Sequence, residues 1–352
     1  MIDMETYNAL HGEEDEVRNQ ADTLPWRGNL TPEEMQSEGP PPGNFTLLLP
    51  PTIKAFRFHD KKWKTLAVEH LQDINWDTEA FKKLVFDKQK KKLIQALVMN
   101  HVVNSSSADI IESKGNGLII LLHGPPGTGK TLTAESVAEF SKRPLYRLTS
   151  GDIGTDPEIV EKSLEHIFYL GNIWKAVVLL DECEVFMEER VPTDLKRNAL
   201  VSVFLRALEY YDGILILTSN RVGTFDEAFK SRMHLAMYYP TLEQDDREEI
   251  WSNFFQKLAD EKDQDPGLDI DVKGLMSSTQ SLAQHKINGR QIRNAIRTAR
   301  QLALFDNETF SASHIRDCIK VVKEFERYVE ETQGESSTKR AELTGIRKDP
   351  ES

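Results

Sequence analysis

The stretch Gly124-Pro125-Pro126-Gly127-Thr128-Gly129-Lys130-Thr131 decides the fold of this 352-residue chain. It fits the spacing G-x-x-x-x-G-K-[ST], in which glycines let backbone N–H groups close around phosphate oxygens without a Cβ in the way. An apolar run of strand length, residues 117–123, precedes it, and residues 131–140 follow with apolar side chains at helical spacing. Strand, glycine-rich turn and helix in this order predict a phosphate-binding loop at a helix N-terminus.

Each part of this loop has an expected contact with a bound nucleoside triphosphate. The Lys130 ammonium is expected to reach the β- and γ-phosphates, and the Thr131 hydroxyl to ligate Mg²⁺. The backbone amides of the loop and of the first helical turn are expected to hold the remaining phosphate oxygens. The predicted nucleotide-binding residues are Gly124, Pro125, Pro126, Gly127, Thr128, Gly129, Lys130, Thr131 and Leu132.

A pair of adjacent carboxylates is the second signal. Asp181 and Glu182 directly follow an apolar run at residues 176–180. Ligands of open α/β sheets bind beyond the carboxyl ends of the strands, so we expect this strand to lie beside the strand at 117–123. Asp181 then holds Mg²⁺, directly or through water, and Glu182 polarises a water molecule aimed at the γ-phosphate. Strand ends are commonly polar, so this interpretation depends on the phosphate loop.

A third strand with a polar end gives another candidate. The apolar run at residues 214–218 is followed by Ser219 and Asn220. The Asn220 side chain is expected to orient the attacking water or to contact the γ-phosphate. An asparagine that only forms a turn is the alternative reading.

Strand and helix patterns alternate through the first two thirds of the ordered chain, which predicts a doubly wound parallel α/β sheet. After residue 240 the strand signal stops and only helical patterns follow, which predicts a small all-α domain. The predicted strands cover residues 117–123, 145–148, 176–180, 214–218 and 235–239. The predicted helices cover residues 78–101, 131–140, 157–169, 194–211, 246–258, 272–284, 289–304 and 311–331.

Composition narrows the class of protein. The chain is 39% hydrophobic, and no apolar run approaches the roughly 20 residues that span a bilayer. The acidic N-terminus lacks the pattern of a signal peptide or a mitochondrial presequence. Cys183 and Cys318 form no disulfide framework or metal motif, and we interpret both as packing residues. We therefore expect a soluble intracellular protein, in the cytoplasm, with the nucleus or an organelle left open.

Taken together, these stretches resemble the AAA+ ATPases over residues 76–330. Residues 124–131 match the Walker A motif, residues 179–182 match Walker B, and Asn220 stands in the sensor 1 position. The chain is similar in particular to AAA-family ATPase-domain proteins common in filamentous fungi. The resemblance implies a P-loop NTPase sheet followed by a helical lid, with ATP and Mg²⁺ as cofactors and ATP hydrolysis as the reaction.

The resemblance also assigns a role to Arg232. Residues 225–232 look like the second region of homology of the AAA proteins, which makes Arg232 the candidate arginine finger. A cation at the γ-phosphoryl group stabilises the charge that builds up in the transition state. In such proteins the arginine acts on the nucleotide of the next subunit. The alternative is an arginine in an ordinary surface salt bridge.

A second arginine is assigned through the lid. Residues 288–292 open a helix as sensor 2 does, which places Arg290 on the bound phosphates. The alternative for Arg290 is an interdomain ion pair without nucleotide contact. Arg293 and Arg297, farther along the same helix, are also candidates for this contact.

The sequence predicts four regions. Residues 1–60 are an irregular acidic N-terminal segment with a linker, and residues 61–240 are the α/β nucleotide-binding domain. Residues 241–332 are the helical lid, and residues 333–352 are a disordered tail.

The expected function is a ring-forming ATPase, most simply a homo-hexamer, that remodels a protein substrate. Two alternatives remain: a nucleotide-dependent interaction module with negligible turnover, and a DNA-directed AAA+ loader. The formal net charge of −13 argues against the loader, because nucleic-acid binding needs a basic surface. Residues 150–155 lack the aromatic residue of many pore loops, so the sequence does not indicate substrate threading.

Overall fold

The computed structural model describes residues 1–19, 50–103, 117–221, 223, 225–265, 267 and 269–333. The chain divides into two compact units, Met1–Asn75 and Trp76–Ser352. The predicted disordered tail lies outside the described residues from residue 334 onward, as do residues 20–49 of the predicted N-terminal segment.

The first unit contains regular structure, part of it within residues 1–60, where the sequence suggested an irregular segment. It consists of helix α1 (Met4–Asn19), strands β1 (Thr52–Arg57) and β2 (Lys62–Ala67), and the 3₁₀ helix η2 (Val68–His70). β1 and β2 form an antiparallel hairpin in which Phe56 lies opposite Trp63. The Phe56 N–H donates to the Met1 carbonyl at 2.8 Å, and the Tyr7 ring lies edge-on to Trp63. Aromatic residues of the helix and of the hairpin therefore pack against one another.

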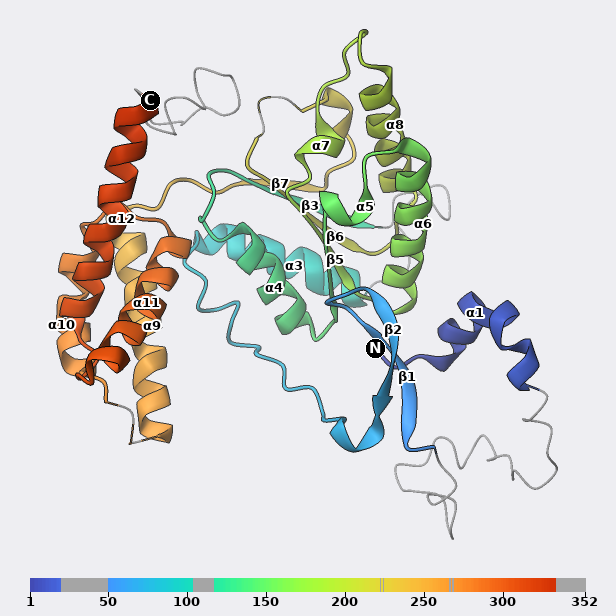
Figure 1. The fold of residues 1–352 in the computed structure, drawn as a ribbon. Helices are drawn as coiled ribbons and strands as arrows, with labels where there is room; N and C mark the ends of the chain where they lie inside the picture. The colour runs from blue at the N-terminus through green and yellow to red at the C-terminus, as the bar shows by residue number, and fades with distance from the viewer. Residues whose placement is uncertain are drawn as a thin grey trace. The chain divides into compact units, whose positions relative to one another are not determined.

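In the second unit, five parallel strands of the described residues form one sheet (Figure 1). This confirms the predicted doubly wound parallel fold. The strands are β3 (Leu118–His123), β4 (Leu145–Thr149), β5 (Val177–Asp181), β6 (Ile214–Ser219) and β7 (Leu235–Tyr238).

The strand order corrects one expectation. The sequence analysis placed β3 and β5 side by side, but the order is β4-β5-β6-β3-β7, with β6 between them. Ile214 of β6 pairs with Leu118 of β3 on one side and with Val177 of β5 on the other. The phosphate loop and the acidic pair are therefore one strand apart, and side chains rather than adjacent backbones must connect them.

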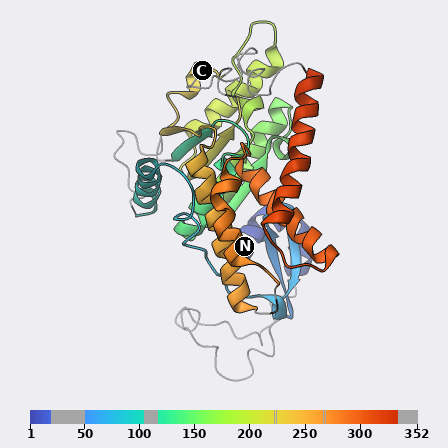
Figure 2. The same ribbon diagram turned by 90° about the vertical axis from the view of Figure 1, so that its left-hand side faces the viewer.

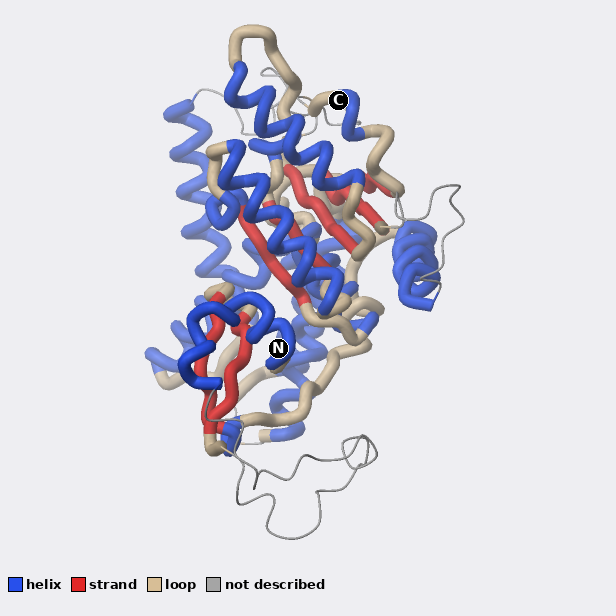
Figure 3. Tube along the Cα trace, turned by 90° about the vertical axis from the view of Figure 1, so that its right-hand side faces the viewer, coloured by secondary structure: helices blue, strands red, loops and turns tan. Residues whose placement is uncertain are grey.

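Helices cover both faces of the sheet, which is why its strands are almost wholly apolar. Helices α3 (Lys88–Val103) and α4 (Lys130–Ser141) pack on the face that includes Leu179 and Ile216. Helices α6 (Pro157–Ile173) and α8 (Leu195–Glu209) lie on the other side (Figure 1). Figure 3, viewed from that side, shows helices crossing in front of the strands. Three short helices, α5 (Ser150–Ile153), α7 (Glu184–Met187) and η3 (Glu227–Phe229), lie in the connections.

The helix predicted over residues 78–101 is wrong in its first part. α3 begins at Lys88, and the Asp87 carboxylate accepts the N–H of Lys90 at 2.8 Å at its start. Residues 78–83 form turns instead, and residues 84–87 form neither helix nor strand. Phe81 is nevertheless buried, with its ring 4.8 Å from that of Phe140. The apolar spacing here reflects burial on the core, which a turn can also satisfy.

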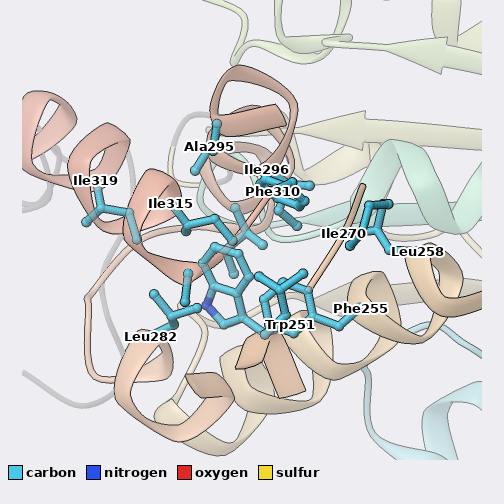
Figure 4. Close-up of a cluster of buried hydrophobic side chains, with 14 of the residues drawn as sticks. Trp251, Phe255, Leu258, Ile270, Leu282, Ala295, Ile296, Phe310, Ile315 and Ile319 are labelled. Atoms are coloured by element: carbon cyan, nitrogen blue, oxygen red, sulfur yellow. The ribbon is translucent and has the colours of Figure 1, made fainter. Parts of the chain in front are cut away.

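The C-terminal part of the second unit is all-α, as predicted. Its helices are α9 (Gln244–Gln264), α10 (Val272–Ala283), α11 (Gly289–Asp306) and α12 (Ala312–Gln333). These helices lie together (Figure 2). They enclose a separate apolar core around Trp251 and Phe255, both fully buried (Figure 4). This lid therefore has its own packing, independent of the core of the sheet.

An ion pair fixes the connection that leads into β7. The Arg190 Nε donates to Asp226 Oδ2 at 2.6 Å, and its Nη2 donates to Oδ1 at 3.2 Å. Asp226 is buried and also accepts the N–H of Ala228 at 3.0 Å, which caps η3. The hydrogen bonds from Arg190 lower the pKa of Asp226 below its usual value.

The lid core predicts a sharp contrast between two phenylalanines. Phe255→Ala should lower the free energy of unfolding by about 3–5 kcal/mol, because it empties a fully buried site. Phe305, 83% exposed on the same lid, is the matched control, and Phe305→Ala should change stability by about 0.5 kcal/mol or less. Urea unfolding of both variants measures the difference, and equal effects would contradict the description of the lid core.

The Asp226–Arg190 pair predicts a pH dependence. A carboxyl whose pKa is lowered on folding adds stability above its unfolded pKa of about 4 and loses it as the pH falls through the folded value. The difference in unfolding free energy between wild type and Asp226→Asn should therefore be constant near neutral pH and shrink below about pH 4. Urea unfolding across this range tests it. Glu227→Gln, at an exposed neighbour, is the control with little expected effect, and a difference that grows toward acid pH would refute the assignment.

Candidate functional site

The phosphate loop joins β3 to α4 and needs its glycines. Gly124, Gly127 and Gly129 have φ angles of +139°, +77° and +103°, in the region that L side chains rarely adopt. A Cβ on Gly124 would lie 2.2 Å from the carbonyl oxygen of Tyr239. Gly129 stands at the N-cap of α4, and no side chain among the described residues caps that end. The first-turn N–H groups of α4 are thus left for another acceptor.

The Lys130 side chain lies inside this loop. It is 7% exposed, and its Nζ donates to the carbonyl oxygens of Gly124 at 2.8 Å and Pro125 at 2.7 Å. An ammonium group that donates to carbonyl oxygens can also donate to phosphate oxygens. The Lys130 side chain is therefore in a position to exchange the two loop carbonyls for the oxygens of a phosphate. The arrangement fits a bound phosphate chain.

The other loop residues have simpler positions. Thr128 is buried, and its hydroxyl donates to the Pro125 carbonyl at 2.9 Å, which closes the turn. Leu132 is 53% exposed at the start of α4, and Pro126 is exposed.

The structure brings Thr131 and Asp181 together. The Thr131 hydroxyl donates to Asp181 Oδ1 at 3.0 Å, with Oδ2 at 3.3 Å. Asp181 ends β5, which β6 separates from β3, and its side chain is only 10% exposed. A hydroxyl oxygen next to a carboxylate is a ligand set that suits Mg²⁺, a cation that usually keeps several waters. No cluster of three or more acidic, histidine or cysteine ligands exists among the described residues.

Thr218 of β6, which the sequence analysis did not assign, links both acids. Its hydroxyl donates to Asp181 Oδ1 and accepts the backbone N–H of Glu182 at 3.0 Å. Glu182 is exposed and has a φ of +56°, a left-handed conformation that costs energy for a side chain of this kind. The hydrogen bond from the Glu182 N–H to Thr218 helps to hold that turn.

Asn220 follows directly after β6. Its side chain is half-buried, and its backbone N–H donates to Glu184 Oε1 at 2.6 Å. Glu184 also accepts from the Ser219 hydroxyl at 3.2 Å, and the Ser219 carbonyl accepts the N–H of Gly124. Glu184 is a second residue that sequence reasoning missed. The end of β6 is therefore tied both to the phosphate loop and to the segment after the acidic pair.

Arg232 lies away from the other candidates. Its Nη1 donates to the Ala228 carbonyl at 3.0 Å, and its Nη2 lies 3.5 Å from Glu209 Oε2. The following residue pair enters β7 beside the start of β3, where the His234 N–H donates to the Ile119 carbonyl. Arg232 thus stands at the amino ends of the strands, whereas the phosphate loop follows their carboxyl ends. A six-residue strand spans about 20 Å, which an arginine side chain does not bridge.

Arg290 begins close to the phosphate loop. It is the second residue of α11 and exposed, and the preceding Gly289 donates its N–H to the Gly127 carbonyl at 2.9 Å. The Asn288 carboxamide covers Gly127 so closely that a Cβ there would lie 2.4 Å from it. The start of the lid helix therefore touches the loop directly, through a glycine on each side.

Two further observations concern the cysteines and membrane-spanning helices. Both cysteines are free, and burial raises the pKa of the Cys183 thiol well above its usual value. A helix long and apolar enough to cross a membrane does not occur within the described parts of the chain.

Two family models match the chain. The model described as "ATPase family associated with various cellular activities (AAA)" matches residues 120–241. The model described as "Fungal AAA+ ATPase lid domain" matches residues 242–336. Together they run without a gap through more than half of the chain, over both the sheet and the lid.

Curated relatives match a smaller region. The chain is 30% identical over 145 residues to human ATPase family AAA domain-containing protein 3B, which covers 39% of this chain and 22% of that protein. It is 28% identical over 180 residues to the Drosophila melanogaster ATPase family AAA domain-containing protein 3A homolog, over 47% of this chain and 30% of that protein. The match thus spans less than a third of each of these relatives. The motifs, the sheet, the lid and both family models agree that this chain belongs to the AAA family of ATPases.

Proposed function

We propose that this chain binds ATP with Mg²⁺ and hydrolyses it at the carboxyl edge of the sheet. The observation that carries the proposal is the 3.0 Å contact between the Thr131 hydroxyl and Asp181, beside the buried ammonium of Lys130. This contact brings the start of α4, which carries Lys130 and Thr131, to the end of β5, fifty residues later in the chain. The name "ATPase" in the matching family and relatives supports the same chemistry.

The chain's own residues would divide the work as follows. Lys130 and the amides of the loop hold the phosphates, while Thr131 and Asp181 hold Mg²⁺, which neutralises charge on the phosphate oxygens. Glu182, exposed beside the site, takes the proton of the attacking water. Asn220 positions that water from the end of β6. The two adjacent acids thus serve one as metal ligand and one as base.

The position of Arg232 supports a role between subunits. Arg232 stands at the amino ends of the strands, so its own phosphate loop is out of reach. A neighbouring copy could place the carboxyl ends of its strands, with its phosphate loop, against the amino ends of the strands of this chain. The Arg232 guanidinium could then leave Glu209 and contact the neighbour's nucleotide. Repetition of such a head-to-tail contact closes into a ring, for which we propose a homo-hexamer.

The lid would carry the mechanical output. The start of α11 touches the loop through Gly289, and Arg290 stands next to that contact. The presence or absence of a γ-phosphate can therefore change the position of the lid relative to the loop. A protein is the proposed substrate, because the acidic charge of the chain disfavours nucleic acid.

Steady-state phosphate release tests hydrolysis. Glu182→Gln should lower turnover by about 10²–10⁴-fold, because it removes the base, while ATP binding persists. Lys130→Ala should instead weaken ATP binding itself, because it removes the phosphate-binding cation. Binding is measured with a fluorescent ATP analogue. Wild-type protein that binds ATP but releases phosphate no faster than Glu182→Gln would support the interaction module instead.

A mixing experiment tests the action of Arg232 between subunits. Arg232→Ala and Glu182→Gln should each be inactive alone, because every site lacks the arginine or the base. Mixed rings should regain activity, because a site with Glu182 intact receives Arg232 from a Glu182→Gln neighbour. Arg206→Ala, at an exposed pair with Glu161, is the control that should stay active. No recovery in rings shown by sizing to be mixed would contradict the trans role.

A further inference from the structure

Arg147 of β4 contacts the carboxylate on which the proposed metal site depends. Its Nη2 donates to Asp181 Oδ2 at 2.7 Å. Its Nη1 lies 3.5 Å from Glu135 Oε1, on α4 one turn after Thr131. Arg147 pairs in register with Leu179, so it lies on the same face of the sheet as Asp181. A guanidinium thus stands between the metal-site carboxylate and the helix that follows the phosphate loop.

Both oxygens of Asp181 accept hydrogen bonds in this state, from three donors in all. A carboxylate accepts about four hydrogen bonds. Oδ1 accepts from Thr131 and Thr218, and Oδ2 accepts from Arg147, with Thr131 at longer range. Arg147 therefore takes the oxygen that the other two residues leave most open.

The contacts of Asp181 differ in whether they tolerate a metal ion. A hydroxyl such as that of Thr131 can donate to the carboxylate while its lone pairs face a cation. The guanidinium of Arg147 carries a positive charge and no lone pair to offer, so it repels a divalent cation across the same carboxylate. Only the arginine contact opposes metal binding.

We infer that Arg147 competes with Mg²⁺ for Asp181. It neutralises the buried carboxylate when no metal is bound and leaves it when metal and nucleotide arrive. The side chain is 49% exposed, so it can swing into solvent at little cost, and Glu135 stays within reach as an alternative partner. Arg147 is thus a positioning residue that sets the Mg²⁺ concentration needed for tight nucleotide binding. This inference rests on the proposed function.

A purely structural role predicts a different result. If Arg147 only joined β4 to β5 and α4, its removal would loosen Asp181 and weaken metal binding. Competition predicts the reverse, because loss of the guanidinium frees one carboxylate oxygen and removes a repelling charge. The sign of the change in Mg²⁺ dependence therefore distinguishes the two roles.

The test is a Mg²⁺ titration of fluorescent ADP binding to the full chain. In Arg147→Ala, the Mg²⁺ concentration for half-maximal binding should fall by about three- to tenfold, given a half-exposed charge. Arg147→Gln should follow Arg147→Ala, because it also lacks the charge, and Arg147→Lys should stay near wild type. Arg206→Ala is the matched control, since it removes a comparable arginine–glutamate contact elsewhere.

Each outcome has a separate meaning. An unchanged or raised Mg²⁺ requirement in folded Arg147→Ala or Arg147→Gln, with wild type showing Mg²⁺-dependent ADP binding, would overturn the competition alone. Wild type whose ADP binding shows no dependence on Mg²⁺ would overturn the proposed metal site and the competition together. Circular dichroism and thermal unfolding establish that each variant is folded.

Discussion

The site depends on one buried carboxylate that joins three elements of the sheet domain. Asp181 accepts from Thr131 on α4, from Thr218 on β6 and from Arg147 on β4. Hydrogen bonds to an ionised group are stronger than neutral ones, and a buried charge without them is costly. Because β6 separates β3 from β5, these side chains are what connect the phosphate loop to the acidic pair. The arrangement of the carboxyl edge of the sheet therefore depends on the contacts that these three side chains make with Asp181.

The length of the parallel sheet separates the candidate residues into two groups. The loop, the acids and Asn220 gather at the carboxyl ends of the strands, and Arg232 is held by Glu209 at the amino ends. Under the proposed function, one chain would therefore contribute half of an arginine-dependent site at each end of its sheet. That polarity is what makes assembly of several copies a natural requirement of the proposed chemistry.

Much of the fold follows from local sequence patterns, and the errors have physical causes. Apolar runs locate all five strands because a parallel sheet is buried on both faces. The order of the strands depends on long-range pairing, so β6 between β3 and β5 had no local signal. The apolar spacing of residues 78–87 wrongly predicted a helix, because a non-helical segment can also bury side chains at that spacing. The loop and Asp181 were readable as motifs, whereas Thr218 and Arg147 act through contacts across strands. Arg147 is a charged residue inside a short apolar strand, and this local feature could have indicated its role.

A structure determined with Mg²⁺ and a non-hydrolysable ATP analogue tests the central claim most directly. The account predicts the metal on the Thr131 hydroxyl with Asp181 as its direct or water-bridged partner, and the Lys130 ammonium moved from the loop carbonyls to the phosphates. It also predicts that Arg147 has left Asp181. A nucleotide bound elsewhere, or a metal that does not involve Thr131 and Asp181, would contradict the account.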